Sequence, residues 1–539
     1  MNNSNFRFLS FASLSLFIGL TPLACGDDGD SPGTAGKGGT SSTAGKANVG
    51  GEDNGGTSNG GTSNGGTSNG GTSNGGNLNL GGDDNGVGGG EGGAGGEATV
   101  AKSRLRVVHA SPNAPAVDIY VKGSSAVAVE NVEYGEATEF LEVDAGTIAF
   151  DLRAAGAEVS EDAAFTSEDI TLEEGAEYTL VAAGELGAED EEVSFRILPL
   201  QHDFDAAEAG VAQARVVHAT TAWEDVDLDL ASTEDAVDLP GLARFGSETV
   251  ALPTTATDDV SFSAADAVVS ELVLPKLASE SEVFVIATGN PGFPFRAPAN
   301  GFALLVVDQD GKTSWVKENP WIHVLHASDV GTVDFYTSAA PTVKLEDNLA
   351  QGALGAFQLR ASTTGYTLKA VDADAPNGSV TNDAQGTTST LIVGEHYLSY
   401  LAGDQIRTIR EQFDLTQTDE VLLRGVHGVK AGAVAAGVDF GPVNVAGTEL
   451  TSVLVAGVAP GLASSTVTGD SVAPGALTLG VAATGTTTPV LATLALTGTA
   501  STPAAPVAGE RDFVLVTGAT AAAAKLYVVD TSVAGWSVR

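Results

Sequence analysis

The sequence predicts an all-β protein in which four tandem antiparallel β-sandwich domains, immunoglobulin-like in shape, follow a disordered glycine-rich segment. Three observations lead to this prediction. The composition changes near residue 100, apolar residues beyond that point alternate with polar ones in short runs, and the same motifs return at a period of about 100–110 residues. A period of that length corresponds to a whole domain and not to a solenoid repeat.

Residues 1–24 are predicted to be the signal peptide of a lipoprotein. They contain one basic residue, Arg7, and then an apolar run from Phe8 to Leu20 that is interrupted by serines. This run is too short and too rich in serine for a membrane span, but it fits the hydrophobic part of a secretory signal. We therefore expect the protein to be exported to the cell envelope.

Cys25 is the single cysteine of the chain, and it directly follows the predicted signal. One cysteine cannot form an internal disulfide, so each fold must be held together by its apolar core. The stretch Pro22-Leu23-Ala24-Cys25 resembles a bacterial lipobox, although that motif usually has leucine where this chain has Pro22. The resemblance implies that Cys25 is acylated and anchors the protein at the outer membrane or cell surface. Ordinary signal cleavage without lipidation is the alternative.

Residues 25–100 are predicted to be a disordered tether. Gly, Ser, Thr and Asn dominate this segment, and residues 54–73 are four tandem copies of Asn-Gly-Gly-Thr-Ser. Such a sequence has too little apolar surface to offset the entropy lost when a backbone is ordered. We expect it to act as a flexible spacer between the lipid and the domains.

Four repeats are predicted beyond the tether, at residues 101–212, 213–319, 320–419 and 420–539, the last being the most divergent. Each repeat opens with a motif that contains a histidine, as in residues 106–110 (RVVHA), and an aspartate preceded by valine follows each histidine. A second block, an apolar run that begins with an aromatic residue and closes on glycine, returns near the end of each repeat. The histidines and aspartates are His109 and Asp118, His218 and Asp227, His326 and Asp334, and His427 and Asp439. The second blocks are residues 178–184, 284–289, 397–403 and 513–518.

Short runs of alternating apolar and polar residues indicate the strands. In residues 117–122, Val, Ile and Val alternate with Asp, Tyr and Lys, and the third repeat has the same pattern near residue 334. Such runs, separated by Gly, Pro, Asn and Asp, are typical of half-buried strands. Sustained helical periodicity is absent from the sequence, which favours β-sandwiches.

Residues 106–121 (RVVHASPNAPAVDIYV) resemble the opening of the domain-of-unknown-function family 4397. The second and third repeats keep the core of this motif, whereas the fourth keeps little beyond His427 and the Val438-Asp439 pair. The resemblance implies exported bacterial domains that often stand in tandem on cell-surface proteins. It implies no established activity and provides no catalytic residues.

The repeated histidine and aspartate have two interpretations. A histidine with a carboxylate can form a general base and the group that orients it, or two ligands of a metal ion. An enzyme needs its site once, however, and these residues recur in every repeat, which favours a structural role such as a buried histidine with a satisfied hydrogen bond. Closely spaced aspartates such as Asp225, Asp227 and Asp229 lie along a predicted strand and form no calcium-binding loop. We therefore predict no catalytic residues, no metal site, no cofactor and no enzymatic activity.

The net charge of the chain makes nucleic acid an unfavourable partner. The chain has 69 acidic and 25 basic residues, a formal net charge of −44, which disfavours binding to nucleic acid. Residues 101–212 contain 24 acidic and 6 basic residues, whereas residues 421–539 contain 6 acidic and 5 basic residues, so the fourth repeat has little self-repulsion and is our candidate for contact with a partner. The alternative is that it is a diverged terminal repeat that simply closes the array.

The sequence thus favours a monomeric surface protein with a structural or adhesive role. Its expected partners are the membrane, through Cys25, and an extracellular polymer or another component of a cell surface. The alternative is an extracellular module that binds a polysaccharide or a peptide. A metal-dependent enzyme ranks third.

Overall fold

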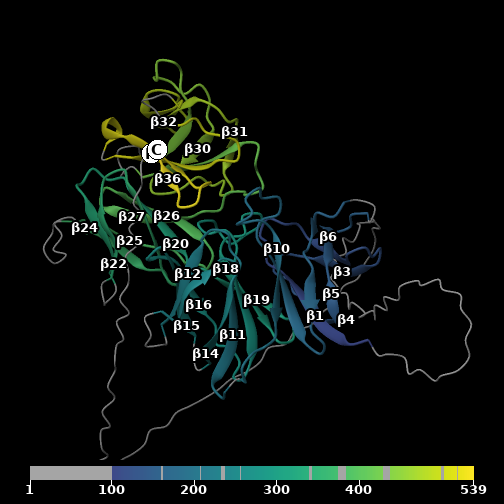
Figure 1. Cartoon of the computed structure of the whole chain (residues 1–539). Helices are drawn as coiled ribbons and strands as arrows, with labels where there is room; N and C mark the ends of the chain where they lie inside the picture. Colours follow the sequence, from purple (N-terminus) through teal and green to yellow (C-terminus); the bar gives the residue numbers. More distant parts are fainter. Residues whose placement is uncertain are drawn as a thin grey trace, which may run out of the picture. The chain divides into compact units, whose positions relative to one another are not determined.

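The computed structural model describes residues 100–539 with the exception of 159–161, 207, 232–236, 255–256, 339–342, 374–383, 429–436, 499–502 and 519. The predicted signal peptide and almost all of the predicted tether therefore lie outside the described residues. Within the described part, Figure 1 shows strands and no α-helix, and a single 3-10 turn spans Ala521–Ala523. The prediction of an all-β fold is confirmed.

Two four-stranded sheets face each other to form the first sandwich. One sheet has the strand order β10-β9-β1-β4 and the other β3-β2-β6-β7, and β5 pairs with β8. Leu105 and Leu180 from one sheet share a core with Ile119 and Leu152 from the other. The strands are β1 Lys102–His109, β2 Val117–Val121, β3 Val127–Val132, β4 Leu141–Asp144, β5 Gly146–Ile148, β6 Phe150–Ala154, β7 Phe165–Thr166, β8 Ile170–Leu172, β9 Glu177–Ala183 and β10 Arg196–Gln201.

The second sandwich repeats this arrangement with one strand more in its first sheet. Its sheets have the orders β14-β11-β17-β18-β19 and β13-β12-β15-β16. Val216 and Val285 from one sheet share a core with Leu228 and Phe262 from the other. The strands are β11 Val211–His218, β12 Asp225–Leu230, β13 Leu239–Ala243, β14 Ser247–Pro253, β15 Asp258–Ala264, β16 Ala267–Leu274, β17 Glu282–Thr288, β18 Ala303–Asp308 and β19 Thr313–Lys317.

In the third sandwich the two sheets are continuous and form a single eight-stranded sheet, with the order β22-β21-β24-β25-β27-β26-β20-β23. The joint is narrow, because β25 and β27 pair only where Gln385 lies opposite Gln405. The strands are β20 Trp321–His326, β21 Val333–Thr337, β22 Lys344–Leu349, β23 Leu354–Gln358, β24 Thr367–Asp372, β25 Ala384–Thr387, β26 His396–Ala402 and β27 Gln405–Arg410.

The fourth sandwich has the sheet orders β31-β28-β34-β35-β36 and β30-β29-β32-β33. Its core is built from smaller side chains than the others, with Phe440 beside several valines and leucines. The strands are β28 Val421–His427, β29 Val438–Pro442, β30 Val455–Val458, β31 Asp470–Val472, β32 Leu477–Ala483, β33 Val490–Leu496, β34 Arg511–Thr517, β35 Lys525–Asp530 and β36 Ser537–Val538.

The two repeated sequence blocks lie side by side in every sandwich. The strand that carries the histidine motif pairs with the strand of the second block, and this pairing is parallel in all four cases: β1 with β9, β11 with β17, β20 with β26 and β28 with β34. The sequence predicted antiparallel sandwiches. The structure differs by this parallel pair in each sandwich and, in the third, also by the short parallel pairing of β25 with β27. Parallel neighbours need a long connection, which the strands of the second sheet provide.

These paired strands are buried on both faces, where the sequence predicted half-buried strands. On β1, Val107 faces the core of its own sandwich while Val108 packs against residues of the second sandwich. Strands covered on both faces need nearly continuous apolar runs. We call the apolar residues between the first and second sandwiches the first interface cluster: Val108, Ala110, Val181, Ala183, Val217, Ala219, Phe284, Ile286, Leu305 and Val307.

The third and fourth sandwiches share an equivalent set of buried apolar side chains. We call this set the second interface cluster: Leu325, Ala327, Leu398, Tyr400, Phe413, Leu422, Val426, Phe513, Leu515, Val529 and Trp536. All described residues belong to one compact unit. The first and second sandwiches, and likewise the third and fourth, are therefore joined by apolar packing as well as by the chain. The domain boundaries given above remain predictions.

Candidate functional site

The four histidines of the repeated motif occupy equivalent positions. Each is the last residue of the first strand of its sandwich, and each has 1% or less of its surface exposed. A histidine buried to this extent needs hydrogen-bond partners for its ring nitrogens, because an unsatisfied polar group costs free energy inside a protein.

The rings of His109 and His326 bind equivalent backbone groups, each in its own sandwich. In the first sandwich, His109 Nε2 lies 3.0 Å from the carbonyl oxygen of Pro115, and the backbone N–H of Ser111 points to Nδ1 at 3.4 Å. In the third, the corresponding distances from His326 are 2.7 Å to Gly331 and 3.4 Å to Ser328. This geometry fits a neutral ring with its proton on Nε2, which holds the following loop against the strand.

His218 makes a different bond, because its Nδ1 lies 3.0 Å from the carbonyl oxygen of Leu242 on β13, a strand of the other sheet. Its Nε2 is buried without a hydrogen-bond partner among the described residues. Burial lowers the pKa of His109, His218 and His326 below the ordinary value of 6.5. These three rings are therefore expected to be neutral at pH 7.

The four aspartates bind the backbone at a β-bulge. Each lies at a register shift between the second and third strands of its sandwich and accepts a hydrogen bond from the N–H of a residue with positive φ. Positive φ is a conformation that glycine and asparagine adopt more readily than most residues. The pairs are Asp118 with Asn131 at 2.8 Å, Asp227 with Gly241 at 2.7 Å, Asp334 with Asn348 at 2.8 Å and Asp439 with Gly457 at 2.7 Å.

In the first and fourth sandwiches, the other carboxylate oxygen of the aspartate accepts a hydrogen bond from a second backbone N–H. Asp118 accepts from Gly156 at 2.9 Å, and Asp439 accepts from Gly485 at 2.9 Å. In the third sandwich the side chain of Lys344 takes this place, 2.7 Å from Asp334. In the first three repeats the histidine and the aspartate thus bind different backbone segments.

One acidic group that sequence reasoning missed lies in the fourth sandwich. Glu510, Asp512 and Asp530 are the only three potential metal ligands that converge within 4.8 Å among the residues that the structure describes. Asp512 and Asp530 face each other across β34 and β35, a pairing that no sequence motif reveals. Burial and the charge of Asp530 raise the pKa of Asp512. The guanidinium of Arg539 lies among the three carboxylates, 2.8 Å from Asp512, and supplies the positive charge.

A second group without a sequence signal is a stack of rings between the third and fourth sandwiches. His323 Nε2 and His396 Nδ1 lie 3.3 Å apart, and the ring of Trp536 stacks on His323 with 4.0 Å between centroids. Burial lowers the pKa of His396 to about 3 and that of His323 far below its usual range. The stack therefore acts as part of the apolar contact between the two sandwiches.

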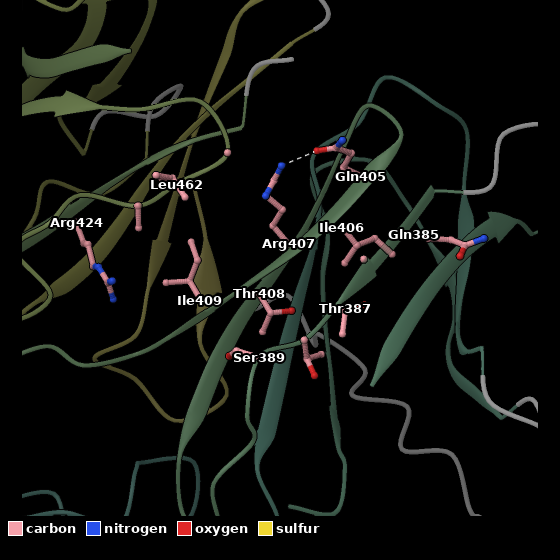
Figure 2. A pocket seen from close by; sticks show the side chains of 14 residues that line it. Gln385, Thr387, Ser389, Gln405, Ile406, Arg407, Thr408, Ile409, Arg424 and Leu462 are labelled. Carbon is pink, nitrogen blue, oxygen red and sulfur yellow. Dashed lines mark hydrogen bonds between the residues drawn. The ribbon is translucent and has the colours of Figure 1, made fainter. Parts of the chain in front are cut away.

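The structure also has a pocket of about 630 Å³ beside the joint between β25 and β27. Residues of the fourth sandwich complete its wall, as Figure 2 shows for Arg424 and Leu462. The close approach of the two strands requires glycine at position 386, because a Cβ there would lie 1.8 Å from the carbonyl oxygen of Ile406. The fourteen lining residues are Gln385, Gly386, Thr387, Thr388, Ser389, Gln405, Ile406, Arg407, Thr408, Ile409, Arg424, Gly461, Leu462 and Ala463.

The predicted lipidation site, Cys25, lies outside the described residues. Among the described residues, no helix has the length and apolar character needed to cross a membrane.

Comparisons with known proteins give a family for part of the chain. No curated protein matches the sequence. Among solved structures, the Bacillus anthracis TIE protein aligns at 10% identity over 56% of this chain and 50% of its own, with a TM-score of 0.12. A product complex of SpuA, a multi-modular glycogen-degrading pneumococcal virulence factor, aligns at 11% identity over 51% of this chain and 36% of its own, with a TM-score of 0.13. This chain thus spans no more than half the length of either structure.

A family match covers residues 103–229, and the family is described as a domain of unknown function, DUF4397. The matched range contains the first sandwich from β1 to β10 and continues through β11 and most of β12 of the second. It therefore includes the histidine and the aspartate of two successive repeats, His109 with Asp118 and His218 with Asp227. Residues 103–229 contain a DUF4397-like domain.

Proposed function

We propose that this protein is an exported, lipid-anchored surface protein with a non-catalytic structural or adhesive role. The observation that carries the proposal is the packing of repeated sandwiches through buried outer sheet faces. The first interface cluster joins the first and second sandwiches and the second joins the third and fourth, and these apolar contacts favour stiff pairs over a string of four freely moving domains. A stiff array at the end of a lipid-anchored spacer can present a surface at a distance from the membrane.

The contacts of the repeated histidines and aspartates support a role without catalysis. For His109, His326 and three of the aspartates, the hydrogen bonds end mainly on backbone groups of turns and bulges, so these side chains already have partners. A catalytic base must instead be free to reach a proton on a substrate.

A second candidate function is a module that binds an extracellular ligand, and the pocket of the third and fourth sandwiches favours it. The volume of this pocket falls within the range of small-molecule sites. Binding there would be compatible with a structural role for the rest of the array.

The anchor is tested by replacing Cys25 with serine in the native host. We expect the Cys25→Ser variant to move from the membrane fraction to the soluble exported fraction, because the acyl chains on this residue are the proposed attachment. Thr43→Ser, a conservative change within the glycine-rich segment, is the matched control and should remain with the membrane. Unchanged fractionation of Cys25→Ser would contradict the lipoprotein proposal.

The adhesive role is tested in the same strains by counting cells attached to a surface coated with envelope polymer. Cells with Cys25→Ser should lose attachment to the extent that cells without the protein do, whereas Thr43→Ser cells should attach normally. Equal attachment of all strains would contradict adhesion, and a changed cell shape or envelope integrity would then favour the structural role.

A further inference from the structure

The pocket beside β25 and β27 differs in charge from the rest of the molecule. None of its fourteen lining residues is acidic and two are arginines, in a chain with 69 acidic and 25 basic residues. Figure 2 shows Arg407 on the third sandwich and Arg424 on the fourth. Glu411 lies close enough to act on the charge of Arg424, but its carboxylate is paired with Arg296. An arginine guanidinium without a carboxylate partner of its own attracts an anion and can bind it with two parallel hydrogen bonds.

Arg407 is held in place at the exposed side of the pocket. Its Nη2 donates a hydrogen bond to Gln405 Oε1 at 2.8 Å, which Figure 2 marks with a dashed line. The guanidinium lies flat against Gly461, where a Cβ would be 2.7 Å from Arg407 Cζ. An arginine fixed in this way loses less conformational entropy when it binds an anion than a free surface arginine does.

Arg424 is the buried counterpart, and it differs from the equivalent arginines of the first two sandwiches. Arg106 and Arg215 stand at the same place in the repeated motif, and the Nε of each donates to a threonine, at 2.9 Å in Arg106 and 3.3 Å in Arg215. All three arginines also donate from Nη1 to a backbone carbonyl oxygen, which for Arg424 belongs to Arg410 at 2.9 Å. The Nε of Arg424, however, is buried without a hydrogen-bond partner among the described residues.

The remaining lining is suited to hydroxyl groups. Three threonines, a serine and two glutamines offer hydrogen-bond donors and acceptors, and the apolar part is limited to aliphatic side chains such as Ile409 and Leu462. No aromatic residue lines the pocket, so stacking on a neutral sugar ring is not available there. The chemistry therefore favours a ligand that combines several hydroxyl groups with a carboxylate.

We propose that this pocket binds an acidic saccharide, with Arg407 directed to the carboxylate of a uronic acid residue, Arg424 adding positive charge on the opposite wall, and the threonine, serine and glutamine side chains directed to its hydroxyl groups. A cavity of about 630 Å³ has room for more than one sugar ring. This inference rests on the second candidate function, the ligand-binding module, and names its ligand class.

The test is calorimetric titration of the purified full-length protein with trigalacturonate, with maltotriose as the neutral sugar and sodium phosphate as the simple anion. We expect binding of trigalacturonate that weakens as salt is added, little binding of maltotriose, and no competition from phosphate at an equal concentration. Arg407→Gln should lower the affinity by about tenfold or more, because a charge-assisted hydrogen bond is lost at an exposed position that does not support the fold. Arg104→Gln, an equal charge change on the exposed surface of the first sandwich, is the matched control and should bind as the wild type does.

Four outcomes would overturn the inference. They are equal binding of maltotriose, full displacement by phosphate, equal affinity of Arg407→Gln and Arg104→Gln, and no binding of trigalacturonate at all. Each is measured in solution, so it leaves the membrane attachment and the cell attachment of the proposed function to be decided by the Cys25→Ser experiments.

Discussion

A histidine at the end of a buried strand can satisfy two backbone groups at once, and His109 does so. Its ring lies between the carbonyl oxygen of Pro115 and the N–H of Ser111, at the start of the loop that leads to the second sheet. A neutral imidazole is suited to this position because it has one donor and one acceptor on opposite sides of a flat ring. The sequence prediction of a structural role agrees with these contacts and still requires a direct test.

His109→Ala should lower the free energy of unfolding by about 1–3 kcal/mol and the melting temperature by several degrees, because the carbonyl oxygen of Pro115 loses its buried partner. The measurement is thermal unfolding of the full-length protein followed by circular dichroism. Glu139→Ala, on an exposed side chain of the same sandwich, serves as the control and should leave the melting temperature nearly unchanged.

The pH dependence of this variant gives a second readout. Burial lowers the pKa of His109 in the folded state, so below about pH 6.5 the unfolded chain takes up a proton that the folded chain does not. The contribution of His109 to stability is therefore complete above that pH and decreases as the pH falls. His109→Ala should show less loss of stability between pH 7 and pH 5 than the wild type. Stabilisation of the wild type by zinc or calcium that disappears in His109→Ala would instead favour a metal site.

At the scale of the secondary-structure elements, the second and third strands of each sandwich are linked by the same local arrangement, a β-bulge bound by an aspartate. A register shift on the second strand places an aspartate opposite a residue with positive φ, and the carboxylate accepts the N–H of that residue. A bulge leaves one residue outside the regular ladder, and its N–H needs another acceptor. This hydrogen bond stabilises the bulge and the bend that the bulge gives to the sheet.

Asp118→Asn should destabilise the first sandwich by about 1–3 kcal/mol, since both carboxylate oxygens accept backbone N–H groups and an amide can accept only one of them well. Hydrogen exchange of the Asn131 and Gly156 amides, measured by NMR or mass spectrometry, reports the effect at the bulge itself. Asp144→Asn removes an exposed carboxylate that pairs with Lys102, and we expect a change of less than about 1 kcal/mol. If the two variants were equally stable, the carboxylate would not be needed for the bulge.

At the scale of the whole molecule, the sandwiches are not independent in their packing. Strands such as β1 and β9 present one apolar face to their own core and the other to the first interface cluster. Exposing that second face to water would remove favourable apolar burial, at about 25 cal/mol for each Å². An exposed apolar patch also promotes association between molecules.

We expect the fragment of residues 101–209 to be less stable than the same sandwich within residues 101–319, and to self-associate. The smaller fragment exposes Val108 and Val181, which the second sandwich covers in the larger one. Sedimentation velocity and chemical unfolding of both fragments provide the measurement. Val108→Ser in the smaller fragment should reduce self-association, which attributes the effect to this face. A monomeric small fragment with the stability of the larger one would show that the interface cluster contributes little.

Much of the fold follows from local sequence. Alternating apolar residues near 117–121 and the absence of helical periodicity were enough to predict an all-β protein, because side chains of a strand point to opposite faces in turn. The repeated opening of residues 106–121 was enough to recognise the DUF4397-like domain now matched over residues 103–229. These features depend on neighbours in the chain, which a sequence shows directly.

Tertiary structure alone decided which residues meet from distant parts of the chain. Nothing in the sequence pairs Asp512 with Asp530, stacks His323 on Trp536, or places Arg407 and Arg424 on one pocket. The parallel pairing of β1 with β9 could not be predicted from the sequence either, because it depends on how the intervening strands cross to the second sheet. The sequence by itself predicted the strands, the repeated motifs and a DUF4397-like domain. The structure decided the buried outer faces and the pocket, because contacts between separate strands depend on register and packing, which local patterns do not encode.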